Sequence, residues 1–347
     1  MNFKSMIIMA GASLVFASCH HPVFDYEGDC EVNYYMSFVY DMNLKWADAF
    51  PSEVNSVNLY AFDENGIFVE EFTAGGEEVS RPGYLLHLDM PAGEYQLLAW
   101  CGLDSESGDG ENFTVTQPVK GVTRIEEMTC RLRTESLTRG EEYSDMRLNF
   151  LYHGYMTVSL PDSQDGRDYY YTMLLTKDTN HIRVMLQQVS DDISAEDFNI
   201  SLTSANGEMA YNNAIIGDTD ITYLPWYTDT NVLGVGNKDG VITEYTGVIA
   251  DLSTCRMMMA DMDEMRLNVR NKDNSSLIFS VPIIQYSLTA KKYYEEAYGH
   301  RMTDQEFLDR QDEYMLTFFL DEDMKWIYTI IDILSWRVII RNYEVGN

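Results

Sequence analysis

The chain has 347 residues, with 24 Lys and Arg against 56 Asp and Glu, which gives a formal net charge of −32. Such a charge repels the phosphates of nucleic acids, and we therefore exclude DNA and RNA as partners. Hydrophobic residues make up 45% of the chain and aromatic residues 13%, which is enough for packed cores and excludes wholesale disorder.

The first nineteen residues have the layout of a lipoprotein signal. A positive residue, a short apolar run and two small residues precede a cysteine, in the order Lys4, 6–16, Ala17, Ser18 and Cys19. The run is too short to cross a hydrocarbon core of about 30 Å and is typical of a cleaved secretory signal. We expect a signal peptide over residues 1–18, a lipid on the thiol of Cys19 and a tether over residues 19–30. The alternative is an ordinary cleaved signal with an incidental cysteine.

Alternating apolar and polar residues predict β-strands from residue 32 onward. Val32, Tyr34, Met36, Phe38 and Tyr40 share one face of a period-two pattern. Residues 57–61 and 67–69 alternate on either side of an Asp-Glu-Asn-Gly turn at 63–66, which predicts a hairpin because Asn and Gly accept positive φ. Further strands are expected at 84–88, 95–100, 146–152 and 156–160.

A linker rich in Asp, Ser and Gly at 161–168 precedes a second block of strands. Apolar runs follow at 182–186, 198–202, 265–269, 277–284, 316–320 and 336–340, and an Ala-Asn-Gly turn at 205–207 repeats the earlier hairpin chemistry. Short strands spaced about ten residues apart, with Gly and Asn turns, are typical of β-sandwiches. We predict an all-β protein with two sandwiches in series, over residues 31–165 and 166–347.

Two short helices interrupt the second block near the C-terminus. One is expected from about Leu288 to Tyr298. The other begins at a capping box formed by Thr303 and Glu306 and continues to about Asp312. The predicted fold therefore includes a short helical insertion.

The sequence contains no catalytic or metal-binding motif. It lacks a nucleophile elbow, a zinc-binding His pair and a phosphate-binding loop, and its acidic clusters lack the spacing of a calcium loop. We expect no enzyme activity, no cofactor and no metal. Besides Cys19, four cysteines allow three full disulfide pairings or isolated buried thiols: Cys30, Cys101, Cys130 and Cys255.

Two aromatic clusters suggest a binding surface as an alternative function. Tyr169 to Tyr171, and Trp226 with Tyr227, are suited to stacking on glycan rings. The alternative interpretation of these residues is ordinary packing in a tyrosine-rich sandwich.

Several short motifs follow one another along the whole chain. They are FVYDMN at 38–43, DAF at 48–50, VNLYAFDENG at 57–66, LDMPAGEY at 88–95, LTKDTN at 175–180 and FLDR at 307–310, followed by Tyr314, Phe318, Trp326 and Trp336. In this order they resemble the FimB-like fimbrial anchor lipoproteins, the anchor subunits of the type V pili of Bacteroidales.

This resemblance implies two tandem transthyretin-like β-sandwich domains and a non-enzymatic role. A protein of this kind ties a pilus to the outer membrane through the lipid on Cys19, limits fibre length, and has the other fimbrial subunits as partners. Subunits of this class join when a strand of one completes the open sheet of another. The terminal segment is suited to be such a donor strand, with Trp336, Val338 and Ile340 on one face. The alternatives are an ordinary terminal strand and, for the whole chain, a surface lipoprotein that binds glycan or host protein.

Overall fold

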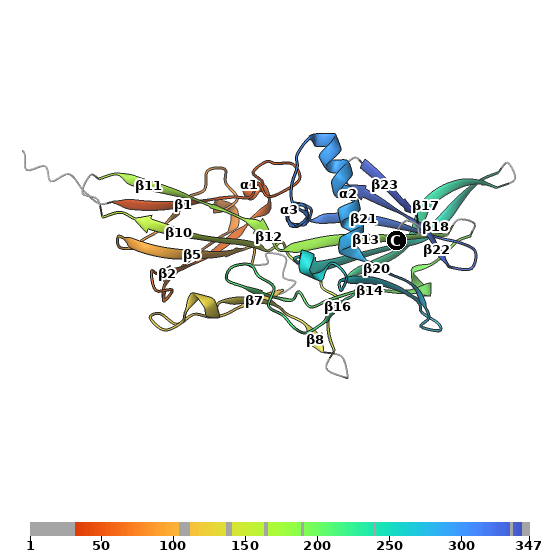
Figure 1. Cartoon of the computed structure of the whole chain (residues 1–347), viewed down its shortest axis with the longest axis horizontal. Coiled ribbons are helices and arrows are strands. Elements are labelled where there is room, and N and C mark those ends of the chain that lie inside the picture. The colour runs from red at the N-terminus through yellow and green to blue at the C-terminus, as the bar shows by residue number, and fades with distance from the viewer. Residues whose placement is uncertain are drawn as a thin grey trace, which may run out of the picture.

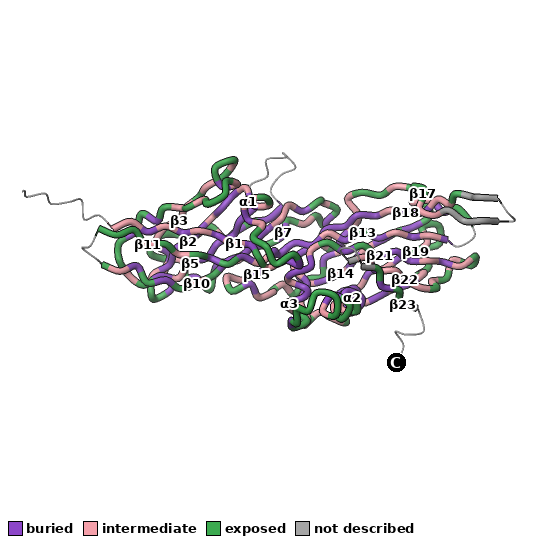
Figure 2. Tube along the Cα trace, turned by 90° about the horizontal axis from the view of Figure 1, so that it is seen from above, coloured by how far each residue is buried: buried purple, intermediate pink, exposed green. Residues whose placement is uncertain are grey.

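The computed structural model describes residues 32–103, 112–136, 141–162, 166–188, 191–238, 241–333 and 336–341. Two β-sandwiches follow one another along the long axis of the molecule (Figure 1). Buried segments run through the middle of both (Figure 2). The predicted all-β fold with a helical insertion near the C-terminus is confirmed.

The N-terminal sandwich consists of two sheets that face each other across an apolar core. One sheet has the order β11-β1-β4 and the other the order β12-β10-β5-β2-β3. Their strands are β1 Asn33–Val39, β2 Ser56–Asp63, β3 Phe68–Gly75, β4 Leu86–His87, β5 Gly93–Cys101, β10 Tyr152–Leu160, β11 Asp168–Leu174 and β12 Thr176–Lys177. Alternate side chains fill the space between the sheets, among them Met36, Leu59, Leu97 and Met173.

The C-terminal sandwich is built from two six-stranded sheets. Their orders are β17-β18-β13-β21-β22-β23 and β20-β19-β14-β16-β9-β8. The strands are β8 Glu135–Ser136, β9 Glu142–Ser144, β13 Thr179–Gln188, β14 Phe198–Ser204, β16 Ile221–Tyr223, β17 Tyr227–Lys238, β18 Val241–Cys255, β19 Arg266–Asn271, β20 Leu277–Pro282, β21 Glu313–Leu320, β22 Trp326–Ile333 and β23 Trp336–Arg341.

A small third sheet links the two sandwiches. It has the order β15-β7-β6, with β6 Phe113–Val115, β7 Thr129–Leu132 and β15 Glu208–Ala210. Its buried side chains join a single apolar cluster that begins at Phe62 and Trp100 of the N-terminal sandwich and continues into the C-terminal core. The small third sheet therefore covers part of the outer face of the N-terminal sheet β12-β10-β5-β2-β3.

Helices lie mainly at the junction and along one side of the C-terminal sandwich. They are α1 Phe50–Glu53, α2 Ile283–Tyr298 and α3 Asp304–Arg310, with 3₁₀ turns at Gly76–Glu78, Ile125–Glu127, Ala195–Asp197 and Met259–Asp261. Thr303 caps α3 as expected, because its side chain accepts a hydrogen bond from the main-chain N of Glu306. Helix α2 begins earlier than predicted, at Ile283. The expected strand 277–284 ends at Pro282, and Ile283 and Ile284 belong to the buried face of the helix.

The two predicted Asn-Gly turns have different outcomes. The turn at 63–66 joins β2 and β3 into an antiparallel hairpin as predicted, with Gly66 at φ +75°. The turn at 205–207 makes no hairpin, because β14 pairs with β16 and β19 while β15 pairs with β7. Asn206 is fully buried there. Its amide donates to the carbonyls of Cys255 and Arg256, and its carbonyl accepts from the hydroxyl of Tyr223.

Strand β11 returns beside the first strand of the chain. It pairs in parallel with β1, with Asn33 opposite Asp168 and Val39 opposite Leu174, so it completes a sheet of the N-terminal sandwich. Strand β12 then pairs with β10, and the chain enters the C-terminal sheet at Thr179. The domain limits predicted above stay a prediction.

Candidate functional site

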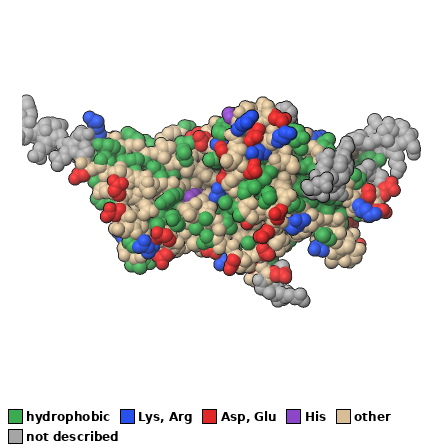
Figure 3. All heavy atoms as spheres, viewed as in Figure 1, with side chains coloured by type: hydrophobic (Ala, Val, Ile, Leu, Met, Phe, Trp, Pro, Cys, Tyr) green, Lys and Arg blue, Asp and Glu red, His purple; other side chains and the backbone are tan. Residues whose placement is uncertain are grey.

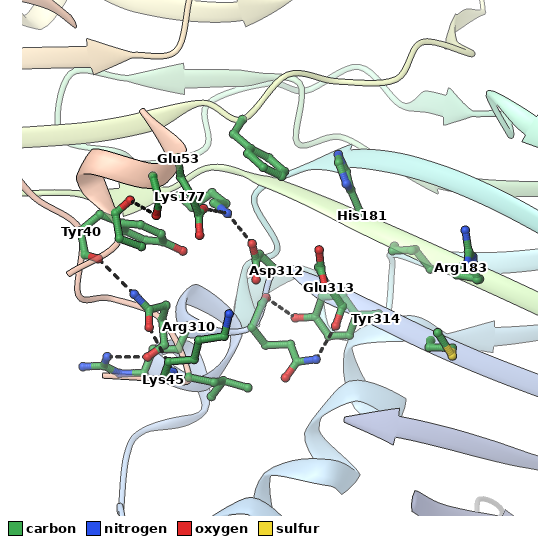
Figure 4. Close-up of a pocket in the computed structure, with 18 of the residues that line it drawn as sticks. Tyr40, Lys45, Glu53, Lys177, His181, Arg183, Arg310, Asp312, Glu313 and Tyr314 are labelled. Atoms are coloured by element: carbon green, nitrogen blue, oxygen red, sulfur yellow. Dashed lines mark hydrogen bonds and ion pairs between the residues drawn. The ribbon is translucent and has the colours of Figure 1, made fainter. Parts of the chain in front are cut away.

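The two sandwiches meet at a cleft of about 880 Å³ (Figure 4). Its walls come from the segment between β1 and α1, from the end of β12 and start of β13, and from the segment between α3 and β21. Three of the motifs that carry the family resemblance, at 38–43, 175–180 and 307–310, contribute residues that meet at this junction. The junction is therefore the structural feature that these motifs share.

A buried lysine forms the centre of the junction. The Nζ of Lys177 lies 2.5 Å from Oε2 of Glu53 and 2.5 Å from Oδ2 of Asp312, and only 1% of its side chain is exposed. Figure 4 shows the two carboxylates on either side of the ammonium. Three aromatic rings surround it, with ring centres 3.9 Å away for Phe150, 5.2 Å for Tyr40 and 5.4 Å for Tyr152. One cation thus connects α1 of the N-terminal sandwich to the residue that precedes β21 of the C-terminal one.

The phenols beside Lys177 remain protonated. Tyr152 donates a hydrogen bond of 2.9 Å to Oε2 of Glu53, and burial together with the charge of Glu53 raises the pKa of Tyr152. Burial, then the nearby charges of Asp312 and Glu53, also raise the pKa of Tyr40. Tyr152 is therefore a fixed donor that holds Glu53 in place.

Arg310 clamps the segment between β1 and α1 onto helix α3. Its Nη1 donates to the carbonyl oxygens of Asp41 (2.9 Å) and Asn43 (3.3 Å), and its Nε pairs with Glu306 at 3.0 Å. The guanidinium lies 3.5 Å from the ring centre of Trp46. Planar cation stacking combined with donation to two carbonyls suits Arg and not Lys.

Trp46 is held from the other side by the helices. Its indole N–H donates to the hydroxyl of Tyr294 (3.0 Å), and its ring stacks on His300 with centres 4.5 Å apart. The Tyr294 hydroxyl in turn donates to the carbonyl of Leu44 (2.6 Å). Trp46 has φ +53°, a left-handed conformation that costs energy for a bulky residue and that these contacts maintain.

A second buried ion pair lies near Asp178, the residue that follows Lys177. Arg256 donates from Nε and Nη2 to the two carboxylate oxygens of Asp309, at 2.8 Å each. Asp178 is fully buried, accepts from the amide of Asn213 at 2.9 Å and lies 3.9 Å from Arg256. Burial raises the pKa of Asp178 to about 7, although the charge of Arg256 opposes this shift.

The predicted lipid site lies outside the described residues. This holds for Cys19, for the signal at 1–18 and for the tether at 19–30, including Cys30. The other cysteines, Cys101, Cys130 and Cys255, are free and buried. Burial raises the pKa of each thiol, which makes them unreactive core residues. The described part of the chain contains no helix long and apolar enough to span a membrane.

The predicted donor segment forms the edge strand of the C-terminal sheet β17-β18-β13-β21-β22-β23. Strand β23 pairs antiparallel with β22, with Ile330 opposite Ile339 and Thr329 opposite Ile340. Val338 and Ile340 are buried in the core of their own domain, and Ile339 is 56% exposed. The backbone of Trp336 pairs with Ile333, and its side chain lies outside the described part. The other edge of β23 has no partner strand among the described residues.

The two aromatic clusters do not form one platform. Tyr170 is 61% exposed and stacks on Tyr35 with ring centres 5.4 Å apart, whereas its neighbours Tyr169 and Tyr171 pack against the N-terminal core. Trp226 lies under the guanidinium of Arg147, at the cleft. In the second cluster Tyr227 is 43% exposed and lies beside Trp226, with ring centres 6.0 Å apart. Each cluster therefore presents one exposed ring beside another ring.

The acidic clusters have structural roles in turns. Oδ1 of Asp63 accepts from the main-chain N–H groups of Asn65 and Ile67, and Oδ1 of Asp321 does the same for Asp323 and Lys325. Within the described ranges, no group of three or more His, Cys, Asp or Glu side chains is placed to hold a metal. Acidic and basic side chains are interspersed over the face shown in Figure 3.

Solved structures with the same two-sandwich architecture come from Bacteroidales. A candidate adhesin of Bacteroides thetaiotaomicron is 30% identical, with a TM-score of 0.75 over 89% of this chain and 97% of its own. A second protein of that species, described as a candidate polysaccharide-binding protein, is 25% identical, with a TM-score of 0.73 over 90% of this chain and 99% of its own. The fimbrial anchor protein Mfa2 of Porphyromonas gingivalis shares the fold, with 18% identity and a TM-score of 0.63 over 89% and 99%.

The architecture and these structures place the chain in the class of fimbrial and adhesin proteins with two β-sandwiches. More specifically, it belongs to the family of fimbrillin-A associated anchor proteins Mfa1 and Mfa2, whose model matches residues 26–342. The minor fimbrium anchoring subunit Mfa2 of P. gingivalis is 26% identical over 242 residues, which cover 67% of this chain and 69% of that protein. The resemblance to fimbrial anchor proteins is thus confirmed, and it supports a role as a fimbrial subunit.

Proposed function

We propose that this chain is a lipid-anchored fimbrial anchor or minor subunit that attaches a pilus to the outer membrane and limits the length of the fibre. The observation that carries this proposal is the family match, which begins at residue 26, a few residues after the predicted lipoprotein signal and Cys19. A lipid on Cys19 would hold the N-terminal end of the protein at the membrane. The two sandwiches, held together at their junction, would transmit force from the fibre to this lipid.

The proposal as a whole is tested by removing the chain from a fimbriated cell. Fimbriae are expected to detach into the medium, and their length distribution is expected to broaden, as measured by electron microscopy of cells and of culture supernatant. Fimbriae that remain on the cells with unchanged length would contradict an anchoring role.

The lipid is tested by the substitution Cys19→Ser. Without the thiol there is no acyl attachment, and the net charge of −32 gives no attraction to an anionic membrane surface. The variant is expected to move from the outer-membrane fraction to the soluble fraction, as measured by fractionation and immunoblotting. Cys101→Ser, at a buried core thiol, serves as the control and should leave the protein in the membrane. Continued membrane association of the Cys19 variant would exclude a lipid on this residue.

We further propose that fimbrial subunits join this chain by strand complementation, with β23 as the donor. The strand is terminal in the described part, lies at a sheet edge and carries alternating apolar side chains, Val338 and Ile340, of the kind that fill side-chain pockets in a partner. To act as a donor it must leave its pairing with β22.

A disulfide that fixes β23 to β22 tests this mechanism without deleting core residues. Ile330 and Ile339 lie directly opposite each other, a separation that a disulfide can bridge. The double variant Ile330→Cys, Ile339→Cys is expected to lose co-purification with fimbrial subunits when oxidised and to regain it after reduction. The single variant Ile339→Cys is the control. Equal co-purification in both redox states would show that assembly uses another surface.

A glycan- or host-binding surface lipoprotein is the second candidate. It is favoured by the exposed ring of Tyr170 stacked on Tyr35, and by the similar protein of B. thetaiotaomicron that is described as a candidate polysaccharide-binding protein. Under this alternative, fimbriae would stay attached in cells that lack the chain, while binding of the cells to glycan would fall.

A further inference from the structure

The junction places an amine beside carboxylates with which it can form an amide. The amine is that of Lys177, and the carboxylates are those of Asp312 and Glu53. The Nζ of Lys177 lies 2.5 Å from one oxygen of each carboxylate, and the lysine side chain is 1% exposed. A nitrogen this close to a carboxylate oxygen is also within reach of the carbon that bears the oxygen. Holding two reactants in this way replaces a bimolecular encounter with a local one and removes much of the entropic barrier.

We propose that the side chains of Lys177 and Asp312 join in an intramolecular isopeptide bond. The Nζ lone pair attacks Cγ of Asp312, an Nζ–Cγ bond forms, and the bond from Cγ to one Oδ breaks. The ammonium and the carboxylate together become one amide and one water molecule, so atoms and charge balance without an oxidant, reductant or other co-reactant. Neutralising two charges inside a low-dielectric junction also removes the energetic penalty of keeping them away from water.

Glu53 carries the proton in this reaction. Lysine must lose a proton before it can attack, and the departing oxygen must gain protons before it leaves as water. Glu53 touches the same Nζ at 2.5 Å and is held by the hydroxyl of Tyr152 at 2.9 Å. It therefore accepts the proton from Lys177 and passes it to the leaving oxygen.

Asp312 is the acceptor because the backbone fixes it beside Lys177. The main-chain N of His181 donates to the carbonyl oxygen of Asp312 at 2.8 Å, at the point where β13 and β21 begin their parallel pairing. The carboxylate of Asp312 is 26% exposed toward the cleft, which allows the released water to leave. The three rings around Nζ shield the opposite side from solvent.

The bond would strengthen the joint between the sandwiches. It would connect the end of β12, where the chain passes from one domain to the other, to the residue just before β21 in the second domain. Tension applied across the junction would then be carried by an added covalent bond as well as by the hydrogen bonds from Arg310 to the carbonyls of Asp41 and Asn43. The inference concerns the folded chain itself and does not depend on the lipid or on the donor strand.

The bond is tested by peptide mapping of the denatured full chain with trypsin. Because trypsin does not cleave after an amidated lysine, the expected product is one branched peptide that joins residues 168–183 to residues 311–325. Its mass equals the sum of the two peptides less one water molecule. Separate peptides ending at Lys177 and spanning 311–325, with no branched product, would overturn the proposal. A branched product that joins Lys177 to the peptide containing Glu53 would overturn the choice of acceptor.

Two variants test the assigned roles. Lys177→Arg keeps a cation in the junction but supplies no nucleophilic amine, so the branched peptide is expected to disappear while the protein remains folded by circular dichroism. Glu53→Gln keeps the shape of the proton carrier and is expected to lower the cross-linked fraction at least tenfold in freshly purified protein. An unchanged fraction in the Gln variant would contradict the role of Glu53. The tryptic peptide map of the wild-type chain tests the isopeptide bond by itself, even if a variant misfolds.

Discussion

Replacing Lys177 with methionine is expected to lower the free energy of unfolding by about 2–3 kcal/mol. Removing one partner of a fully buried ion pair typically costs about 3–5 kcal/mol, since the remaining charge stays buried without compensation. The value is reduced here because Glu53 and Asp312 retain 29% and 26% exposure and are partly solvated. The variant is expected to be less stable whether or not Lys177 and Asp312 are joined by an isopeptide bond in the wild-type chain. In both cases methionine leaves the carboxylates of Glu53 and Asp312 without a cation.

The measurement is urea unfolding followed by circular dichroism, with Lys292→Met as the matched control. Lys292 is 79% exposed and its carboxylate partner lies 4.0 Å away, so its loss should change stability by less than about 0.5 kcal/mol. The unfolding transition of the Lys177 variant is also expected to separate into two steps, because the two sandwiches lose a common tie. Equal effects in the two variants would show that Lys177 does not couple the domains.

Local sequence patterns predicted much of the fold because half-buried strands show their periodicity directly. The alternation at 32–40 and the turn at 63–66 are signals confined to a few neighbouring residues, and both are found in the structure. The helix capped by Thr303 is likewise a local effect. Where the structure departs from expectation, the deciding contacts come from far along the chain.

Asn206 shows why the second turn was misjudged. The turn at 205–207 has a sequence as favourable for a hairpin as the turn at 63–66. However, the side chain of Asn206 donates hydrogen bonds to the carbonyls of Cys255 and Arg256, about fifty residues away. The following strand then pairs with β7, from the first half of the chain. A buried carbonyl that needs a donor outweighs a local turn preference, and no local pattern reveals it.

The junction was not predicted because a buried lysine depends on partners that the sequence separates widely. Glu53 and Asp312 lie 124 and 135 residues from Lys177. The alternation places Lys177 on the same face as the buried Met173 and Leu175, but a lysine is seldom fully buried, so its residue type favours a solvent-facing position. The one available signal was the motif order, since the segments at 38–43, 175–180 and 307–310 all return to this place.

The substitution Asp178→Asn is expected to change how the stability of the protein depends on pH. Burial raises the pKa of Asp178 from its usual 3.8 to about 7 in the folded chain. Between these values the unfolded chain loses the proton and the folded chain keeps it, so ionisation favours unfolding and stability falls as pH rises. A shift of about three pKa units corresponds to a loss of about 4 kcal/mol between pH 4 and pH 7.

Asparagine removes this titration but keeps the shape of the side chain and the contact with Asn213. The difference in unfolding free energy, variant minus wild type, should therefore rise by about 4 kcal/mol from pH 4 to pH 7 and stay constant above pH 7. Urea unfolding at a series of pH values measures this difference, with Asp273→Asn, in an exposed turn, as a control that removes one carboxylate elsewhere. Since other acidic groups titrate alike in all three proteins, the comparison isolates position 178. A difference that stays flat across this range, as expected for the control, would mean that Arg256 compensates the charge of Asp178 and that burial does not dominate at this position.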